Sequence, residues 1–311
     1  MFRSSLVCVA VGVLVGVVGV GAATAARLGT STSPTPDNLV LAAADVPGTT
    51  TFFDGPVPGQ AVPTYARVFV PKAGRSGSAV DAVLLLHPDA ARAAAVVDGL
   101  NAYASTPAGR QALAKAAGEA VRTMLASPVL RAKFGITGHP TVSKLTVGLP
   151  SKPAADTTVL PYTVVFAGVL IHYSAAYVQV DRAIDAVELI SFKRAAPTSA
   201  LAGLIAKARA RMQAGFTVAN TAAPTISGTP TVGQTLTLDD GSWRGGAAQF
   251  AYLWQRCAAD GSTCVPIDAP AGATTYVVSP DDAGSTIRVS VTASNTVSQA
   301  QATSTQTVVV S

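Results

Sequence analysis

Residues 224–243 read PTISGTPTVGQTLTLDDGSW, and they are followed by AYLWQRC at 251–257 and SPDDAGSTIRVSVTASN at 279–295. This part of the chain is rich in Thr, Ser, Gly, Val and Ala and has few residues that favour helices. Turn-forming residues recur about every eight to twelve positions, between short runs that alternate apolar and polar side chains. The pattern predicts an all-β sandwich over residues 224–311.

These three runs closely resemble the Ig-like repeats of bacterial cell-surface proteins. The resemblance places residues 232–234 at the start of the second strand, Trp254 as the buried tryptophan of the third strand, and residues 281–284 at the corner before the strand IRVSVTA. In antibody-type domains this last strand carries a cysteine, which is absent here, so the resemblance implies a core held by packing alone. It also implies that three residues of that strand face inward: Ile287, Val289 and Val291.

Two cysteines flank the turn sequence AADGST, in which Asp260-Gly261 is a tight-turn signal. We therefore expect Cys257 and Cys264 to face each other across a hairpin and to form a disulfide in an oxidising compartment. Zinc would require about four ligands, and the neighbouring sequence offers no further Cys or His. No metal and no cofactor are expected.

The first 26 residues have the layout of a secretory signal peptide. Arg3 precedes an uncharged run that ends in small residues at 23–25, which is typical of a cleavage site. The run is about 21 residues long, enough to cross a bilayer, so an uncleaved membrane anchor is the alternative. We expect an extracellular or cell-surface protein, which meets a membrane only through residues 1–26 if that leader is not cleaved.

A polar, proline-bearing stretch at 27–44 is interpreted as a linker. Beyond it, β-type runs at 64–70 and 81–87 precede helices that begin at Asp89, Thr106-Pro107 and Ser127-Pro128, the last ending near Gly135. Four strand-like runs and a final helix, which ends at Gly215, follow. This order predicts an α+β sandwich over 45–216, in which helices cover a largely antiparallel sheet, and a short polar joint at 217–223.

The element order, with Asp45-Val46-Pro47-Gly48 at its start, resembles the extracellular ligand or sensor domains attached to bacterial lipoproteins and membrane kinases. Some of those domains have a PsbP-like α+β sandwich. The resemblance implies a binding or sensing role for residues 45–216.

The net charge of +5 is unevenly distributed. Residues 40–217 hold 17 Lys/Arg against 10 Asp/Glu, whereas residues 218–311 hold 3 against 6. The first domain could therefore meet an anionic cell-wall polymer, a polysaccharide or another surface protein, although a solvated basic surface is the simpler explanation of the charge. Export argues against a nucleic-acid partner.

Three histidines could act as the base of a hydrolase: His87, His139 and His172. His87 ends a strand just before Pro88-Asp89, which is a good position for a functional loop, so it is a candidate binding or catalytic residue. Neither a G-x-S-x-G nor a C-G-x-C element accompanies it. No catalytic residue is therefore assigned, and the chain is predicted not to be an enzyme.

Acidic groups give no stronger signal. The pairs Asp239-Asp240 and Asp281-Asp282 lack the spacing of a Ca²⁺ loop and are interpreted as turn residues. Asp181 and Asp185 bracket a hairpin turn, and Glu188 follows on the strand. Paired carboxylates can act on glycosides, but a solvated hairpin end is the simpler interpretation.

Among the aromatic residues, Trp243, Tyr252, Trp254 and Tyr276 could form a platform for sugars. The spacing of Tyr252 and Trp254 instead predicts that both are core positions on one strand face. Trp243 is flanked by glycines in an expected loop, so it is the second candidate binding residue.

The functional hypothesis is a non-enzymatic exported protein in which an α+β binding or sensor domain is presented with an Ig-like adhesion or spacer domain. Two alternatives belong to other classes. One is a cell-envelope hydrolase with an Ig-like accessory module, which would require His87 within hydrogen-bonding reach of a carboxylate and a serine. The other is a purely structural spacer.

Overall fold

The computed structural model describes residues 30–72, 78–126, 142–166, 169–192, 194–270 and 272–311. The chain is rich in β-strands, which form several sheets, and it divides into two compact units. Residues 35–213 form one unit, called here the sheet-and-helix unit. The described residues of the other, the all-β unit, are 30–34 and 214–311. The expected leader at 1–26 and the expected helix from Ser127-Pro128 to Gly135 lie outside the described residues, as does His139.

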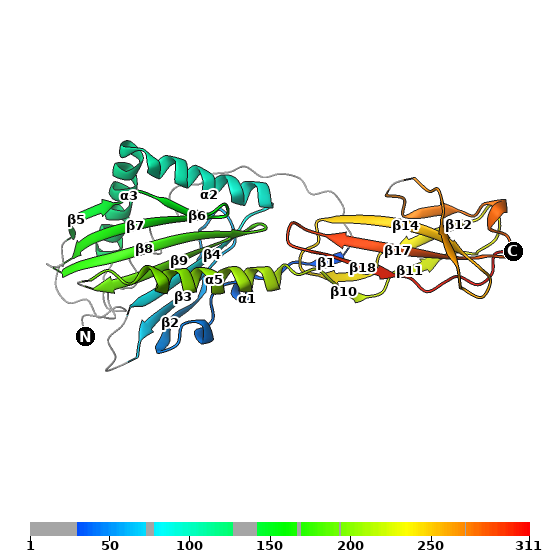
Figure 1. Ribbon diagram of the computed structural model, residues 1–311, viewed down its shortest axis with the longest axis horizontal. Helices are drawn as coiled ribbons and strands as arrows, with labels where there is room; N and C mark the ends of the chain where they lie inside the picture. Colours follow the sequence, from blue (N-terminus) through cyan, green and yellow to red (C-terminus); the bar gives the residue numbers. More distant parts are fainter. Residues whose placement is uncertain (1–29, 73–77, 127–141, 167–168, 193, 271) are drawn as a thin grey trace. The chain divides into compact units, whose positions relative to one another are not determined.

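One antiparallel sheet forms the centre of the sheet-and-helix unit (Figure 1). Its strands follow the order β2-β3-β4-β9-β8-β7-β5, and β6 pairs with β7 outside this path. Strands β7, β8 and β9 pair consecutively as an antiparallel meander, in agreement with the expected largely antiparallel sheet. The bounds are β2 Thr49–Pro56, β3 Thr64–Pro71, β4 Ala79–Leu86, β5 Val142–Val147, β6 Ser151–Ala154, β7 Thr157–Phe166, β8 Val169–Val180 and β9 Ala183–Phe192.

The helices of this unit start where their capping residues predict. Asp89 caps α2, because its Oδ1 accepts a hydrogen bond from the Arg92 amide at 2.8 Å, and Pro107 opens α3. The final helix, α5, ends at Gly215 as predicted, and its buried face consists of Leu201, Leu204, Ile205, Ala208 and Met212. The bounds are α1 Pro36–Leu39, the 3-10 turn η2 Ala43–Asp45, α2 Ala90–Ser105, α3 Pro107–Ala126 and α5 Thr198–Gly215.

Strands β4 and β9 are covered on both faces of the sheet. On one face, Val83 and its neighbours pack with Val97 of α2 and Leu113 of α3 in a single apolar core. The opposite face carries Arg67, whose Nη1 donates to the carbonyl of Leu41 at 2.9 Å. Helix α5 crosses the front of the sheet in Figure 1. Its Arg211 forms an ion pair with Asp45, which lies in the same chain segment as Leu41.

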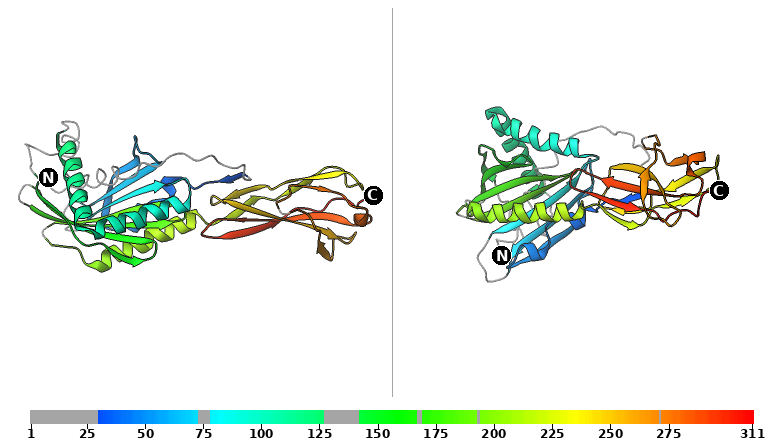
Figure 2. Two further views of the ribbon diagram at one scale, coloured as in Figure 1. Left: turned by 90° about the horizontal axis from the view of Figure 1, so that it is seen from above. Right: turned by 45° about the vertical axis from the view of Figure 1, so that its right-hand side comes forward.

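The all-β unit contains three small sheets, shown from further directions in Figure 2. Their strand orders are β1-β13-β10, β11-β12-β16 and β15-β14-β17-β18. The bounds are β1 Thr30–Thr32, β10 Ala219–Ala222, β11 Thr225–Ser227, β12 Thr235–Asp239, β13 Ser242–Arg244, β14 Gln249–Cys257, β15 Cys264–Pro266, β16 Thr275–Val277, β17 Thr286–Ser294 and β18 Gln299–Thr303, with the 3-10 turn η3 at Pro280–Asp282.

Trp254 lies in the core of this unit, as predicted. It is 1% exposed, its Nε1 donates to the Ala273 carbonyl at 2.9 Å, and its ring centroid lies 5.6 Å from that of Tyr276. The three residues predicted to face inward from β17 are fully buried beside it: Ile287, Val289 and Val291. The expected start of a strand at 232–234 is wrong, because Gln234 donates to the Thr231 carbonyl in a turn and β12 begins at Thr235.

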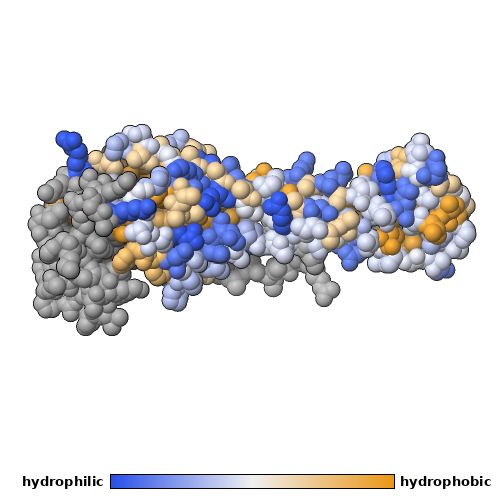
Figure 3. All heavy atoms as spheres, turned by 90° about the horizontal axis from the view of Figure 1, so that it is seen from below, coloured by the Kyte–Doolittle hydropathy of each residue, from blue (hydrophilic) through white to orange (hydrophobic). Residues whose placement is uncertain are grey.

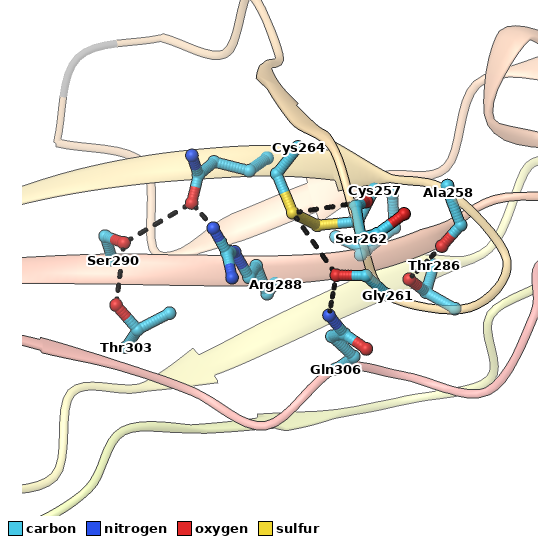
Figure 4. Close-up of a disulfide and its surroundings, with 12 residues drawn as sticks. Cys257, Ala258, Gly261, Ser262, Cys264, Thr286, Arg288, Ser290, Thr303 and Gln306 are labelled. Atoms are coloured by element: carbon cyan, nitrogen blue, oxygen red, sulfur yellow. Dashed lines mark hydrogen bonds between the residues drawn. A yellow bond between two sulfur atoms is a disulfide. The ribbon is translucent and has the colours of Figure 1, made fainter.

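The predicted disulfide is confirmed. Cys257 and Cys264 are paired in register across the hairpin of β14 and β15 and are bonded at 2.02 Å. The turn closes where Gly261, at φ +81°, donates to the Ala258 carbonyl at 2.8 Å. Figure 4 shows two further contacts of the hairpin, Gln306 Nε2 to the Gly261 carbonyl at 2.8 Å and Thr286 Oγ1 to the Ala258 carbonyl at 3.2 Å.

Two boundaries differ from the sequence interpretation. The expected linker at 27–44 includes β1, α1 and three fully buried residues at 39–41. The expected joint at 217–223 includes β10, and Val218 belongs to the core of the all-β unit. The strands in these two stretches form because β13 is paired on both edges, with β1 on one side and β10 on the other. The all-β unit is therefore built from two separate parts of the chain.

We expect Trp254→Ala to lower the free energy of unfolding of the all-β unit by about 3–5 kcal/mol, because truncation leaves a cavity in its core. Leu253→Ala is the matched control on the same strand, since Leu253 is 41% exposed, and it should change the stability by about 0.5 kcal/mol or less. Chemical denaturation followed by tryptophan fluorescence and circular dichroism measures both. Equal stability of the two variants would contradict the core assignment of Trp254.

A fragment of residues 224–311 should be less stable than one of residues 214–311. The shorter fragment lacks β10 and Val218, and burial of one such side chain contributes roughly 1.5–3 kcal/mol. Urea unfolding of the two fragments tests this expectation. Identical midpoints would show that residues 214–223 do not belong to the folded unit.

Candidate functional site

Two carboxylates face each other in the middle of the sheet of the sheet-and-helix unit. Asp81 on β4 is the direct cross-strand neighbour of Glu188 on β9. Asp81 is fully buried and Glu188 is 5% exposed. Within the described residues, no well-formed hydrogen bond reaches either carboxylate oxygen of Asp81, although the backbone amide of Ala82 acts to lower its pKa. Burial of an unpaired carboxyl costs free energy of folding, so the pair is a candidate functional site.

The pair lies on the face of the sheet that α2 and α3 cover. Strand alternation puts Asp81 on the same face as Val83, and Glu188 on the same face as Ala186, both members of the core beneath these helices. Helix α2 presents small side chains to this core, such as Ala93 and Val97. The backbone of α2 is also reached from the sheet, because Thr158 Oγ1 donates to the Val97 carbonyl at 3.4 Å.

Two tyrosines complete the polar group. Tyr177 lies opposite Ala186, and Tyr162 lies in the row of Tyr173 and Ile190, so the two phenols belong to the rows on either side of Glu188. A hydrogen bond joins their side chains. Burial raises the pKa of Tyr162 to about 12 and that of Tyr177 well above its usual range, and the Glu188 carboxylate adds to both shifts. Both phenols therefore remain neutral hydroxyls that can donate or accept hydrogen bonds.

Burial is the main cause that favours the protonated form of both acids. It raises the pKa of Asp81 well above its usual range, and the nearby charges of Glu188 and Asp185 raise it further. Burial also raises the pKa of Glu188 to about 8. Near neutral pH the buried site therefore holds at least one proton on two facing carboxyls.

Asp185 lies on the opposite face of the sheet, because it is separated from Glu188 by three strand positions. It is fully buried, and burial raises its pKa to about 7. The Leu41 backbone amide and the Arg67 charge counter this shift, although no well-formed hydrogen bond reaches either oxygen among the described residues. The interpretation of Asp185 and Glu188 as a solvated hairpin end is therefore wrong, because residues at both positions are covered by helices and loops on both sides of β9.

Asp181 does occupy the turn between β8 and β9, as expected. It has φ +50°, and its Oδ1 accepts a hydrogen bond from the Arg182 amide at 2.9 Å. This local bond accounts for an acidic residue in the left-handed region. Asp181 is thus a turn residue, separate from the buried pair.

His87 follows β4 directly and is only 4% exposed. Burial lowers the pKa of its imidazole, and the charge of Asp89 opposes this effect. In the part of the chain that is described, the buried Nε2 has no hydrogen-bond partner. The structure therefore does not bring a carboxylate and a serine from those residues together at this nitrogen, the arrangement that the hydrolase alternative requires. His172 is half-buried in β8, in register with Thr163 and Ser191.

Trp243 is a core residue in the all-β unit rather than a loop residue. It is 1% exposed in β13, its Nε1 donates to the Asp240 carbonyl at 2.9 Å, and its ring meets that of Phe250 edge to face at 6.2 Å. Because Trp243 and Trp254 are both buried, neither offers an exposed ring on which a sugar could stack. The acidic turns are also occupied: Asp240 accepts from the Tyr252 hydroxyl at 3.1 Å, and the described residues contain no cluster of potential metal ligands.

The basic residues near the end of α5 are engaged within their own unit. Arg209 bonds both oxygens of Asp156, at 2.7 and 3.2 Å, and Arg211 pairs with Asp45. Lys207 donates to the Asp45 carbonyl. On the face drawn in Figure 3, hydrophilic residues are interspersed with apolar ones. Two of the three basic residues near the end of α5 are therefore neutralised by carboxylates of the same unit.

No family model matches the chain, and no curated protein matches its sequence. Among solved structures, the extracellular domain of PknH from Mycobacterium tuberculosis is similar at 10% identity, over 54% of this chain and 70% of that one, with a TM-score of 0.26. None of the helices in the described ranges is both long enough and apolar enough to span a membrane.

Sequence reasoning missed Asp81. The residue stands in the run AVDAVLLL, where its neighbours are apolar on both sides and the strand is short. A single charge inside such a run is a signal of a buried ionisable group, since fully buried strands read as continuous apolar runs. Its pairing with Glu188 required the register of β4 and β9, which join residues far apart in the chain.

We expect the stability of the sheet-and-helix unit to fall as the pH rises from about 4 to about 8. Asp81, Asp185 and Glu188 have raised folded pKa values, so the folded state binds more protons than the unfolded state in this range. Their contribution is fully present below the ordinary carboxyl pKa and is lost as the pH rises through the folded values. Thermal unfolding of the full chain between pH 4 and pH 9 measures the trend.

We compare the free energy of unfolding of Asp81→Asn with that of the wild type at two pH values. The difference should shift in favour of the variant by about 1–3 kcal/mol between pH 4 and pH 8, because the amide needs no proton to remain neutral. Asp98→Asn is the control, since Asp98 lies at the surface beside Lys152. A pH profile of Asp81→Asn that parallels the wild type would contradict a raised pKa at this position.

Proposed function

We propose that the chain is an exported, non-enzymatic surface protein, in which the sheet-and-helix unit is an α+β binding or sensor domain and the all-β unit is an Ig-like domain that presents it. The ligand site of the first unit lies at Asp81 and Glu188, beneath α2 and α3. The Ig-like domain acts as a spacer more than as a carbohydrate-binding module, because Trp243 and Trp254 are both used in its core.

The observation that carries the proposal is the unpaired carboxyl of Asp81 opposite Glu188. Removing a carboxylate from water without a partner costs several kcal/mol, even when the group shifts its pKa instead of remaining charged. A structural spacer does not require a buried, unpaired carboxyl, so this loss of folding free energy would bring it no benefit. Unpaired polar groups retained in a core are typical of binding and catalytic sites, which favours a binding unit over a structural spacer.

The chemistry of the group supports one class of ligand. Two acidic side chains and two neutral phenols bind a cation or a donor of hydrogen bonds, such as an ammonium group, in preference to an anion. This proposal replaces the anionic wall polymer as the ligand of the site with an amine-bearing partner, for example a polyamine or an amine-bearing surface molecule. An anionic polymer remains a candidate only for the outer surface.

The disulfide and the Ig-like features support export. A structural disulfide forms and persists in an oxidising compartment, in agreement with the expected signal peptide at 1–26. The buried Trp254 on β14 and the inward residues of β17 agree with the Ig-like resemblance. The hydrolase alternative has no comparable support, since Nε2 of His87 has no partner among the described residues.

Thermal unfolding of the full chain with and without spermidine at constant ionic strength tests the proposal. A ligand at about a hundred times its Kd stabilises a protein by about 2.7 kcal/mol, so a rise in Tm is expected for the wild type. Asp81→Asn and Glu188→Gln should lose this rise, whereas Asp98→Asn should keep it. An equal rise in all four proteins would show surface binding, and no rise would count against an organic cation as the ligand.

A further inference from the structure

Strand β1 belongs to the all-β unit, although the chain reaches that unit again only after the whole sheet-and-helix unit. Its residues pair in parallel with β13, in the register Thr30 to Ser242, Ser31 to Trp243 and Thr32 to Arg244. The opposite edge of β13 is filled by β10. The other edge of β13, with the turn that follows it, is therefore a groove for one extended strand, and residues 30–34 of the same chain occupy it.

The contacts in this groove are specific but polar. Ser31 Oγ accepts a hydrogen bond from the Ala247 amide at 2.9 Å, the Thr32 carbonyl accepts from the Gly246 amide at 3.1 Å, and Thr32 Oγ1 donates to the Trp243 carbonyl at 3.3 Å. Gly246 has φ +66°, and a Cβ there would lie 3.4 Å from Cδ of Pro34 and 3.7 Å from Oγ of Ser33. The strand thus meets a surface shaped for small, hydroxyl-bearing residues followed by proline.

The acceptor side of the groove is rigid. The indole of Trp243 is anchored in the core, and Gly245 is held by a hydrogen bond of its carbonyl with Asn295 Nδ2 at 2.8 Å. A Cβ at Gly245 would lie 2.4 Å from the Thr217 carbonyl oxygen, so this turn is pressed against the chain on the β10 side. The groove therefore keeps its shape without β1.

The donor strand is held weakly. It has three residues, Thr32 and Ser33 are exposed, and none of residues 31–34 belongs to the apolar core. Each hydrogen bond contributes only about 0.5–1.5 kcal/mol net. The pairing also closes a loop that spans the entire sheet-and-helix unit, so the cis strand competes through an effective concentration of about 1 mM.

We propose that β13 is a strand-acceptor site that exchanges β1 between two copies of this chain. A second copy offers the same Ser31, Thr32 and Pro34, so every contact in the groove is reproduced without a new interface. Residues 30–34 carry no charge, so no repulsion opposes the exchange. The exchange depends on protein concentration and does not require the ligand site of the other unit.

Engineered cysteines in the full chain detect the exchange directly. In a Cys8→Ser background, Ser33→Cys and Gly246→Cys are made as separate proteins, mixed, and oxidised gently; Cys257 and Cys264 are already bonded to each other. Because the two new thiols are on different molecules, a disulfide between positions 33 and 246 forms only when β1 enters the groove of another copy. With about 1 mM effective concentration in cis, on the order of a tenth of the molecules should be linked at about 0.1 mM protein.

Gly233→Cys is the matched control, because Gly233 also has a positive φ in the all-β unit, but a Cβ at that position would have no neighbouring atom within 4 Å. A heterodimer with the 33–246 linkage, identified by peptide mass mapping and formed in lower yield when the peptide GTSTSPTP is in excess, supports the exchange. A yield no greater than with Gly233→Cys overturns it. The double variant Ser33→Cys/Gly246→Cys should form the linkage within one chain, and its failure to do so would overturn the groove itself.

Discussion

The pairing of β4 with β9 is the constraint on which the sheet-and-helix unit depends. The two strands are separated in sequence by both covering helices and by further strands of the same sheet, yet they are neighbours at its centre. Because both faces of the pair are covered, the described side chains of these strands are buried whatever their polarity, except for the half-buried Leu85. The register then decides the chemistry: it sets Asp81 opposite Glu188 on one face and leaves Asp185 on the other. A shift by one residue would move each carboxyl to the other face.

Local sequence signals predicted most of the elements because local physics determines them. Asp89 and Pro107 mark helix starts through capping and a fixed φ, and the apolar face of α5 follows from its period. The same holds for Trp254 and the alternation along β17, and for the hairpin that pairs Cys257 with Cys264. In each case the deciding residues are neighbours along the chain or repeat with a known period, so no long-range information was needed.

The features that sequence reasoning missed all depend on pairing over long distances. Strand β1 is three polar residues beside prolines, a composition that is typical of a linker, and only its partner β13 makes it a strand. Glycines on both sides of Trp243 suggest a loop. Its place in a strand becomes visible only through the pairing of β13 in the same sheet. For Glu188 and Asp185, the alternation of β9 was hidden because both faces are buried and no polar face remains to show a period of two.

Asp282 and Asp81 show how the same side chain at the same burial can have opposite meanings. Both are fully buried, but Asp282 accepts hydrogen bonds from Arg256 Nε at 2.6 Å, from the Tyr276 hydroxyl at 2.6 Å and from the Ser279 amide at 2.7 Å. The hydrogen bond to Asp282 raises the pKa of Arg256, as expected for a matched ion pair, and Asp282 is therefore explained by the corner that it closes before β17. Asp81 has no such partners among the described residues, and the charges that raise its pKa are those of other acids. The cost of burying Asp282 is compensated by its hydrogen bonds, so folding alone explains that residue. The cost of burying Asp81 is not compensated in this way, and this is the strongest physical argument for a functional role in the sheet-and-helix unit.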